Sequence, residues 1–175
     1  MQGNPLISIF PELINFNVKS GGGNYLPFRG CTRLQYVNLE KFTTLNYAGF
    51  QNTQLRYMYL PNATIISNFS INAMAKLKWV EMFKVTTVQN DFFRDCGAIE
   101  KLIMHMTTPP TVSNTLTHIA NNKNLKIYVP DDCVDTYKAA NMWNASNVAN
   151  KIYPLSELLD ENTWKWLYPN LEPYG

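Results

Sequence analysis

The stretch LQYVNL, which begins at Leu34, decides the fold because its spacing of apolar residues returns along most of the chain. Its template is a leucine or isoleucine followed by apolar residues at the fourth and sixth positions. It is fitted by LINFNV, LQYVNL, LRYMYL, LKWVEM and IEKLIM, which begin at residues 13, 34, 55, 77 and 99, and more loosely by LKIYVP from residue 125. The first five copies begin at a nearly constant interval, and the sixth begins slightly later than that interval requires. A fixed period of this length is the signature of a repeat protein.

Two further apolar columns follow the same period. At one fixed distance after a copy begins stand Leu45, Ile66 and Val88, and at a second fixed distance stand Phe50, Ile71 and Phe93. One copy could not bury these residues alone, whereas stacked copies form one continuous core. The sequence therefore predicts a solenoid of about six turns over residues 1–130, mostly β and irregular within the α/β class. We expect parallel strands on one face and short helical turns on the other.

The repeated unit resembles a known family. The stretch FRGCTRLQYVNLEKFTTLNYAGFQNTQL, residues 28–55, is similar to the units of BspA-like leucine-rich repeat proteins, which read F-x-x-C-x-x-L-x-x-I-x-L-P. The later segments TPPTV, LKIYVPDDCVDTYKAANMW and KIYPL resemble the closing part of such proteins from gut bacteria and their phages. The resemblance covers about residues 7–155. It implies a leucine-rich-repeat solenoid and a non-enzymatic binding or structural role.

The carboxyl-terminal part departs from the period. Pro109 and Pro110 predict an extended or turn segment, because proline disfavours helix there. Asp131 and Asp132 are positioned to cap a helix over residues 133–143, which would close the open end of the solenoid. Residues 131–155 are therefore expected to form a cap helix and a closing strand. Residues 156–175 form an aromatic tail, and Trp164 and Trp166 predict docking onto this domain or onto a partner.

The cysteines and histidines give little sign of catalysis. Cys31 and Cys96 occupy the same repeat column three turns apart, about 14 Å at a strand spacing of ~4.8 Å, which is too far for a disulfide. We expect free, buried thiols, with Cys133 lacking an obvious partner. A Cys96–His105 nucleophile pair is the alternative, opposed by the core position of Cys96. Neither His105 nor His118 belongs to a recognised catalytic or metal-binding motif.

The composition of the chain argues against several classes of partner. A net charge of +2, without a basic cluster in the sequence, predicts no nucleic-acid partner. We also expect no membrane span, since no stretch approaches ~18 uninterrupted apolar residues. The Asp131–Asp132 pair lacks the spaced oxygens of a calcium loop, so capping is favoured over a metal, and no cofactor is expected.

The strand residues that face outward are the candidate site. Side chains alternate along a strand, so the third and fifth template positions point away from the core. The proposed partner-binding residues are Tyr36, Asn38, Tyr57, Tyr59, Trp79, Glu81 and Lys101, with Ile103 also predicted to point outward. Tyr36, Tyr57 and Trp79 form a predicted aromatic ladder. Such a ladder either binds a partner or merely stabilises the sheet.

These features together predict a non-enzymatic module that binds a protein or a glycan. The resemblance implies a bacterial cell surface or a phage virion as its setting, and the amino terminus shows no signal peptide. Two alternatives stay open. One is a surface hydrolase domain with a cleft beside the cap, which requires a pocket holding a titratable pair. The other is an architectural spacer, which requires a polar, featureless strand face.

Overall fold

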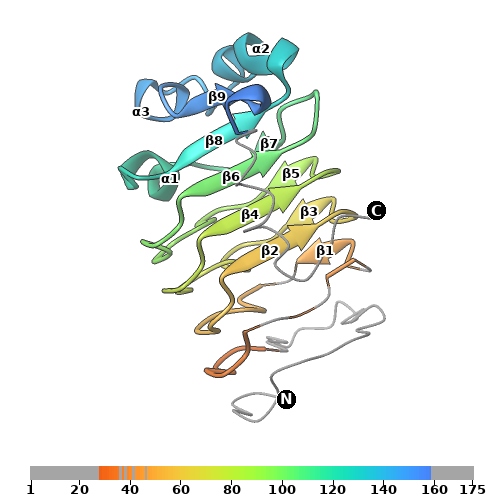
Figure 1. Ribbon diagram of the computed structural model, residues 1–175, viewed down its shortest axis with the longest axis vertical. Helices are drawn as coiled ribbons and strands as arrows, with labels where there is room; N and C mark the ends of the chain where they lie inside the picture. The colour runs from red at the N-terminus through yellow and green to blue at the C-terminus, as the bar shows by residue number, and fades with distance from the viewer. Residues whose placement is uncertain (1–27, 36, 38, 41, 46, 159–175) are drawn as a thin grey trace, which may run out of the picture.

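The computed structural model describes residues 28–158, except residues 36, 38, 41 and 46. These residues form two parallel β-sheets and a few short helices, stacked along the long axis of the molecule (Figure 1). From β1 to β8 the chain visits the two sheets alternately, and β9 then follows β8 in the same sheet. The five-stranded sheet has the order β2-β4-β6-β8-β9, and the four-stranded sheet has the order β1-β3-β5-β7. The predicted parallel pairing is confirmed for this part of the chain.

The five-stranded sheet contains the repeated template. Its strands are β2 (Tyr57–Leu60), β4 (Trp79–Met82), β6 (Lys101–Met104), β8 (Lys126–Val129) and β9 (Ile152–Pro154). Tyr57 pairs with Trp79, and Trp79 pairs with Lys101, so these two steps along the chain are equal in length. Lys101 pairs with Lys126 rather than with Ile127, so the last template copy is shifted by one position from its predicted start.

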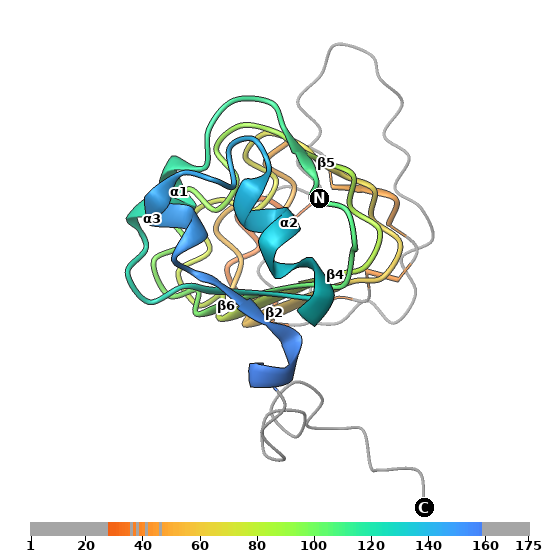
Figure 2. The same cartoon turned by 90° about the horizontal axis from the view of Figure 1, so that it is seen from above.

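The second apolar column forms the four-stranded sheet rather than the predicted helical turns. Its strands are β1 (Thr44–Leu45), β3 (Ile65–Ile66), β5 (Thr87–Val88) and β7 (Thr111–Val112). Leu45, Ile66, Val88 and Val112 are in register across it. Each strand consists of β-branched or leucine residues, and the β-branched ones suit a pleated surface better than a helical turn. The end-on view shows β5 on a different side of the cross-section from β2, β4 and β6 (Figure 2).

The core lies between the sheets and is continuous along the long axis. Leu34, Leu55, Leu77 and Ile99 are each at most 1% exposed and belong to one hydrophobic cluster, as the repeat predicts. Phe50, Ile71 and Phe93 lie in the same cluster. Cys31 and Cys96 are buried in it and neither is in a disulfide, as their shared column predicts.

Polar side chains join successive repeats at the edge of the four-stranded sheet. The hydroxyls of Thr64, Thr86 and Thr111 donate hydrogen bonds of 3.1–3.2 Å to the carbonyls of Thr43, Thr64 and Thr86 respectively. The amide of Asn62 donates to the carbonyl of Glu40, and its oxygen accepts from Lys84. These bonds satisfy turn carbonyls from one repeat to the next, so they fix the stacking register as well as adding stability.

Successive repeats also use left-handed backbone at two recurring positions. One series is Ala48, Phe69 and Asp91, and the other is Gly30, Asn52, Ala73 and Asp95, with φ between 47° and 71°. Glycine is the residue best suited to this conformation, yet only Gly30 in the two series is a glycine. These turns are not predictable from the sequence, because most of them lack the glycine signal.

Replacing Ala73 with glycine is expected to stabilise the protein. Alanine in left-handed backbone costs about 1–2 kcal/mol, whereas the extra unfolded-state entropy of glycine costs about 0.4–1 kcal/mol. The φ of Ala73 is 49°, so we expect Ala73→Gly to raise the free energy of unfolding by about 0.5–1 kcal/mol in urea titrations. Ala75→Gly is the matched control, because Ala75 has no positive φ, and it should destabilise. Equal effects of the two changes would contradict the assigned backbone.

The carboxyl-terminal helices lie at one end of the two sheets, except for the last, which packs on the outer face of the five-stranded sheet (Figures 1 and 2). They are α1 (Thr117–Asn121), the 3-10 helix η1 (Asp131–Cys133), α2 (Val134–Ala139), α3 (Ser146–Ala149) and the 3-10 helix η2 (Leu155–Leu158). The predicted cap helix is present but ends at Ala139, and Tyr137 is its buried residue. The predicted closing strand is β9, which pairs in parallel with β8.

The predicted capping by aspartate is wrong. Neither η1 nor α2 has a side-chain cap hydrogen bond. Asp131 instead accepts a 3.0 Å hydrogen bond from the backbone N–H of Ser156. This bond, with others from the Ser156 hydroxyl and Leu155, lowers the pKa of Asp131. Asp131 therefore fastens the chain that leaves β9. Among the described residues, no helix has the length and apolar character needed to cross a membrane.

Candidate functional site

The outer face of the five-stranded sheet carries one row of aromatic and cationic side chains. Tyr57, Trp79, Lys101 and Lys126 are consecutive register partners on β2, β4, β6 and β8. Their neighbours in the core are at most 2% exposed and are Met58, Val80, Leu102 and Ile127. The alternation of side chains along a strand thus places the four residues of the row outward, where Tyr57, Trp79 and Lys101 are half-buried.

A cation–π contact joins the aromatic and cationic parts of this row. The Lys101 ammonium lies 4.6 Å from the centroid of the Trp79 ring, and tryptophan is the strongest aromatic partner for a cation. The Lys126 ammonium lies 5.0 Å from the Tyr153 centroid at the other end of the sheet. These contacts hold long lysine side chains against the sheet, which reduces the entropy that they lose when a partner binds.

A second outward row runs alongside the first. It contains Tyr59, Glu81, Ile103, Tyr128 and Tyr153, again as register partners. Ile103 points outward as predicted, but it is fully buried because it packs with Tyr128 and Leu158 in a small separate cluster. The expectation of a solvent-facing Ile103 is therefore wrong. The helix η2 therefore covers the outer face near Ile103 and Tyr128. Among the described residues, the part of this face that stays open lies over β2, β4 and β6.

Four side chains on this face form a packed cluster. Nε2 of His105 lies 2.7 Å from Oε1 of Glu81, whose side chain is 12% exposed. The His105 ring stacks on Phe83 with centroids 4.1 Å apart, and the Phe83 ring meets Tyr59 edge-on at 5.3 Å. Burial raises the pKa of Tyr59, and the carboxylates of Glu81 and Glu40 raise it further. Tyr59 therefore carries a neutral phenol at physiological pH, in a rigid setting.

The structure places five of the seven predicted site residues on this face. Tyr57, Tyr59, Trp79, Glu81 and Lys101 lie together as predicted. Tyr36 and Asn38 lie outside the described residues, as do Trp164 and Trp166 of the tail.

Sequence reasoning missed three residues of the face. Phe83 and His105 follow β4 and β6 and join the face only through side-chain packing. The apolar pattern starts the last template copy at Leu125, which makes Ile127 the expected partner of Lys101. The structure pairs Lys101 with Lys126 instead, so the sequence does not identify Lys126 as a residue of the face. The cue that could have found Lys126 is the proline-containing insertion before β8, which makes the preceding interval irregular.

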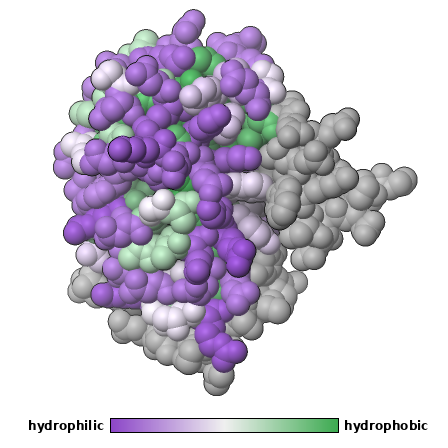
Figure 3. Space-filling model, turned by 60° about the vertical axis from the view of Figure 1, so that its left-hand side comes forward, coloured by the Kyte–Doolittle hydropathy of each residue, from purple (hydrophilic) through white to green (hydrophobic). Residues whose placement is uncertain are grey.

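A pocket of about 350 Å³ lies away from this face, beside α1. It is lined by Phe93, Asp95, Cys96, Gly97, His118, Asn121, Asn122, Lys123 and Asn124. The lining comes from the turn between β5 and β6 and from α1 with the loop that follows it. Figure 3 shows the side of the molecule that carries α1 and α3 as largely hydrophilic, with smaller hydrophobic areas.

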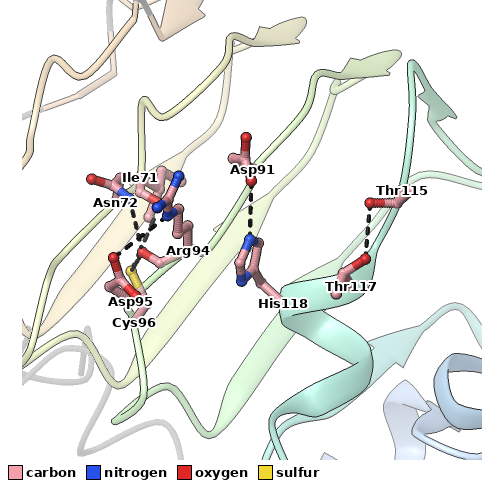
Figure 4. Close-up of polar contacts among 9 residues, drawn as sticks. All are labelled: Ile71, Asn72, Asp91, Arg94, Asp95, Cys96, Thr115, Thr117 and His118. Carbon is pink, nitrogen blue, oxygen red and sulfur yellow. Dashed lines mark hydrogen bonds and ion pairs between the residues drawn. The ribbon is translucent and has the colours of Figure 1, made fainter.

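His118 is one member of a titratable pair, but its partner Asp91 is not among the residues that line this pocket, so the pocket itself lacks the complete pair that the hydrolase alternative requires. Nε2 of His118 lies 3.0 Å from Oδ1 of Asp91 (Figure 4). Cys96 also lines the pocket, but its thiol donates to the carbonyls of Ile71 and Arg94 and is only 2% exposed. Burial raises the pKa of Cys96 to about 12. A nucleophilic cysteine needs the opposite shift, so the Cys96 thiol is not activated here.

His105 does not meet Cys96, since its partners are Glu81 and Phe83 on the outer sheet face. No group of three or more His, Cys, Asp or Glu residues in the described part of the chain is arranged to hold a metal ion. Comparison with known proteins adds no assignment: no family model and no curated protein matches this chain. The outer sheet face and the α1 pocket are thus the two candidate binding sites in the described part of the chain.

Proposed function

We propose that this chain is a leucine-rich-repeat solenoid of the BspA-like type that acts as a non-enzymatic binding module. The regular period, the three apolar columns and the parallel stacking of successive strands support this family. So does a parallel sheet whose outer face the described residues leave open over β2, β4 and β6, because parallel sheets outside repeat proteins are usually covered on both faces. The family resemblance further supports a setting on a bacterial cell surface or a phage virion.

The observation that carries the binding role is the row of Tyr57, Trp79 and Lys101 on the open part of the outer sheet face. Rigid aromatic side chains give large contact areas at low entropic cost, and they dominate the energy of many interfaces. The cation–π contact of Lys101 with Trp79 positions a charge beside them. Glu81 and His105 supply polar groups on the adjacent row. An architectural spacer has no need for such a combination on one face.

A protein or a glycan is the proposed partner of this face. Tyrosine and tryptophan contact both classes, through apolar packing in one case and through stacking on sugar rings in the other. The half-buried Trp79 ring and the neutral phenol of Tyr59 suit either. The experiment therefore uses two probes, an array of bacterial and host glycans and a peptide-display library.

The double substitution Tyr57→Ala, Trp79→Ala tests the proposal. It should remove at least about 2 kcal/mol of binding free energy, roughly a thirtyfold loss of affinity, for whichever probe the wild-type protein selects. Stability should fall by only about 1–2 kcal/mol, since both side chains are half-buried. Tyr47→Ala is the control, because Tyr47 is an exposed aromatic residue outside the five-stranded sheet. A folded double mutant with wild-type affinity would contradict the proposal.

A further inference from the structure

The α1 pocket differs from the outer sheet face in both chemistry and location. Most of its lining residues carry a polar or charged side chain, and the amides come from Asn121, Asn122 and Asn124. Phe93 and Cys96, each 2% exposed, form its apolar base. Its volume of about 350 Å³ lies near the lower end of the ~300–1,000 Å³ typical of ligand sites. The pocket is therefore sized for a small ligand.

The loop beside α1 is held in place by its own hydrogen bonds. The Asn122 amide donates to the carbonyl of Ile99 at 3.1 Å, and its oxygen accepts from the N–H of Asn124 at 3.1 Å. The Lys151 ammonium donates to the carbonyl of Asn122. Asn122 therefore positions the loop. Asn121 and Asn124, which are exposed, supply the amides that a ligand can reach.

Gly97 lines the pocket from the turn between β5 and β6. A Cβ placed on Gly97 would meet nothing within 4 Å, and its backbone is not left-handed. Ala75 stands at the equivalent place in the preceding repeat. Phe93, in the same repeat as Gly97, has a φ of 64°, whereas Ile71 and Phe50, its equivalents, do not have positive φ. This stretch is therefore shaped differently from its neighbours where it borders the pocket.

The charges of the lining favour a small ligand that is polar and neutral. The lining has one carboxylate, Asp95, which is ion-paired with Arg94 at 3.6 Å, and one ammonium, Lys123, so it presents no cluster of like charges that would match an anion or a cation. The His118 ring is already paired with Asp91 (Figure 4). Phe93 is too buried to offer a face on which a nucleobase could stack. Carboxamides both donate and accept, which matches the dual character of hydroxyl groups.

We infer that the α1 pocket binds one neutral sugar residue, held by the amides of Asn121 and Asn124 and the charged groups of Asp95 and Lys123. The site is independent of the outer sheet face, so it stands whether or not that face binds a partner. Either a free monosaccharide or the end of a glycan chain presents the required hydroxyl groups. The two ligands share this chemistry. Comparing the binding of free sugars with that of short oligosaccharides distinguishes them.

The test is a titration of isotope-labelled full-length protein with glucose, galactose, mannose and N-acetylglucosamine, monitored by NMR. We expect saturable shifts of the Asn121 and Asn124 side-chain amides and of the Gly97 N–H for at least one sugar, with a millimolar Kd. Gly97→Leu should weaken that binding at least tenfold by filling the pocket. Ala75→Leu, the matched control, should leave it unchanged, as should Tyr57→Ala, Trp79→Ala.

Four results would overturn the inference. The first is the absence of a saturable shift at these groups for all four sugars and for oligosaccharides that end in them. The second is unchanged sugar binding by folded Gly97→Leu protein. The third is an equal response to glycerol or to sodium sulfate at the same concentration, which would mean non-specific polyol contact or an anion site. Loss of binding in the Tyr57→Ala, Trp79→Ala protein alone would place the sugar on the outer sheet face instead.

Discussion

Trp143→Ala is expected to lower the free energy of unfolding by about 3–5 kcal/mol. Trp143 is fully buried although it follows the short helix α2 near the end of the described chain. Its indole N–H donates a 2.9 Å hydrogen bond to the carbonyl of Pro110, and its ring meets that of Tyr137 edge-on. Alanine would leave a large cavity and a buried carbonyl without its donor.

The size of this effect follows from what Trp143 joins. The Tyr137 hydroxyl donates to the carbonyl of Met106, so Trp143 and Tyr137 together tie α2 and the turn after it to residues 106–110, which connect β6 to β7. Removing this contact opens the end of the core. A protein of this size should lose about 10 °C in Tm, since each kcal/mol corresponds to roughly 2–4 °C.

Thermal and urea unfolding, followed by circular dichroism, measure the change. Trp79→Ala is the control, because it removes a tryptophan from the half-buried outer face and should cost only about 1 kcal/mol. Trp143→Phe keeps most of the ring volume and should fall between the two. A Trp143→Ala protein that melts within about 2 °C of the wild type would contradict the packing of the cap.

Alkaline pH should destabilise the protein through Cys96, which is the second large effect. Burial raises the pKa of its thiol from 9.0 to about 12, so the native state resists ionisation that the unfolded chain accepts. The resulting stability is fully present below about pH 9 and is lost as the pH rises toward 12. Each pH unit in this window removes about 1.4 kcal/mol, so roughly 3 kcal/mol is lost by about pH 11.

Urea titrations between about pH 8 and pH 11 isolate this contribution. The free energy of unfolding of Cys96→Ala should decline less steeply with rising pH than that of the wild type. This holds whatever the stability of the variant at about pH 8. Cys133→Ala removes a half-buried cysteine and should keep the wild-type slope. The pKa of buried Tyr137 is also raised, so its ionisation at high pH lowers the free energy of unfolding equally in all three proteins. An unchanged slope in Cys96→Ala would mean that this thiol ionises easily, which would revive a nucleophilic role.

The periodicity of the sequence is sufficient to predict β2, β4 and β6 and their parallel pairing. Leu34, Leu55, Leu77 and Ile99 recur at a nearly constant interval, and a strand that is half-buried must alternate its side chains. The same logic places Tyr57 and Trp79 outward. It fails where the period changes, which is why Lys126 is assigned to the wrong register. Two-residue strands such as Thr87–Val88 are too short to be recognised by alternation.

The remaining differences arise from contacts between distant segments. Nothing in the local sequence shows that Leu158 folds back over Ile103, or that Asp131 bonds to Ser156 rather than to its own helix. The pairing of Asp91 with His118 joins two different elements that are far apart in the sequence. The α1 pocket likewise combines residues 93–97 with residues 118–124, two segments that only the tertiary structure brings together. Its residues therefore form no sequence motif.

Both proposals depend on the parallel register of the strands in the two sheets. Disulfide trapping measures this register directly in the five-stranded sheet. In a Cys133→Ser background, Tyr57→Cys, Trp79→Cys places two thiols on register partners ~5 Å apart, within disulfide range. Tyr57→Cys, Glu81→Cys offsets the second thiol by two positions, to ~8 Å, which is out of range. Mild oxidation of the folded protein should crosslink the first pair and leave the second reduced. Equal crosslinking of both, or preference for the offset pair, would contradict the register and the binding face built on it.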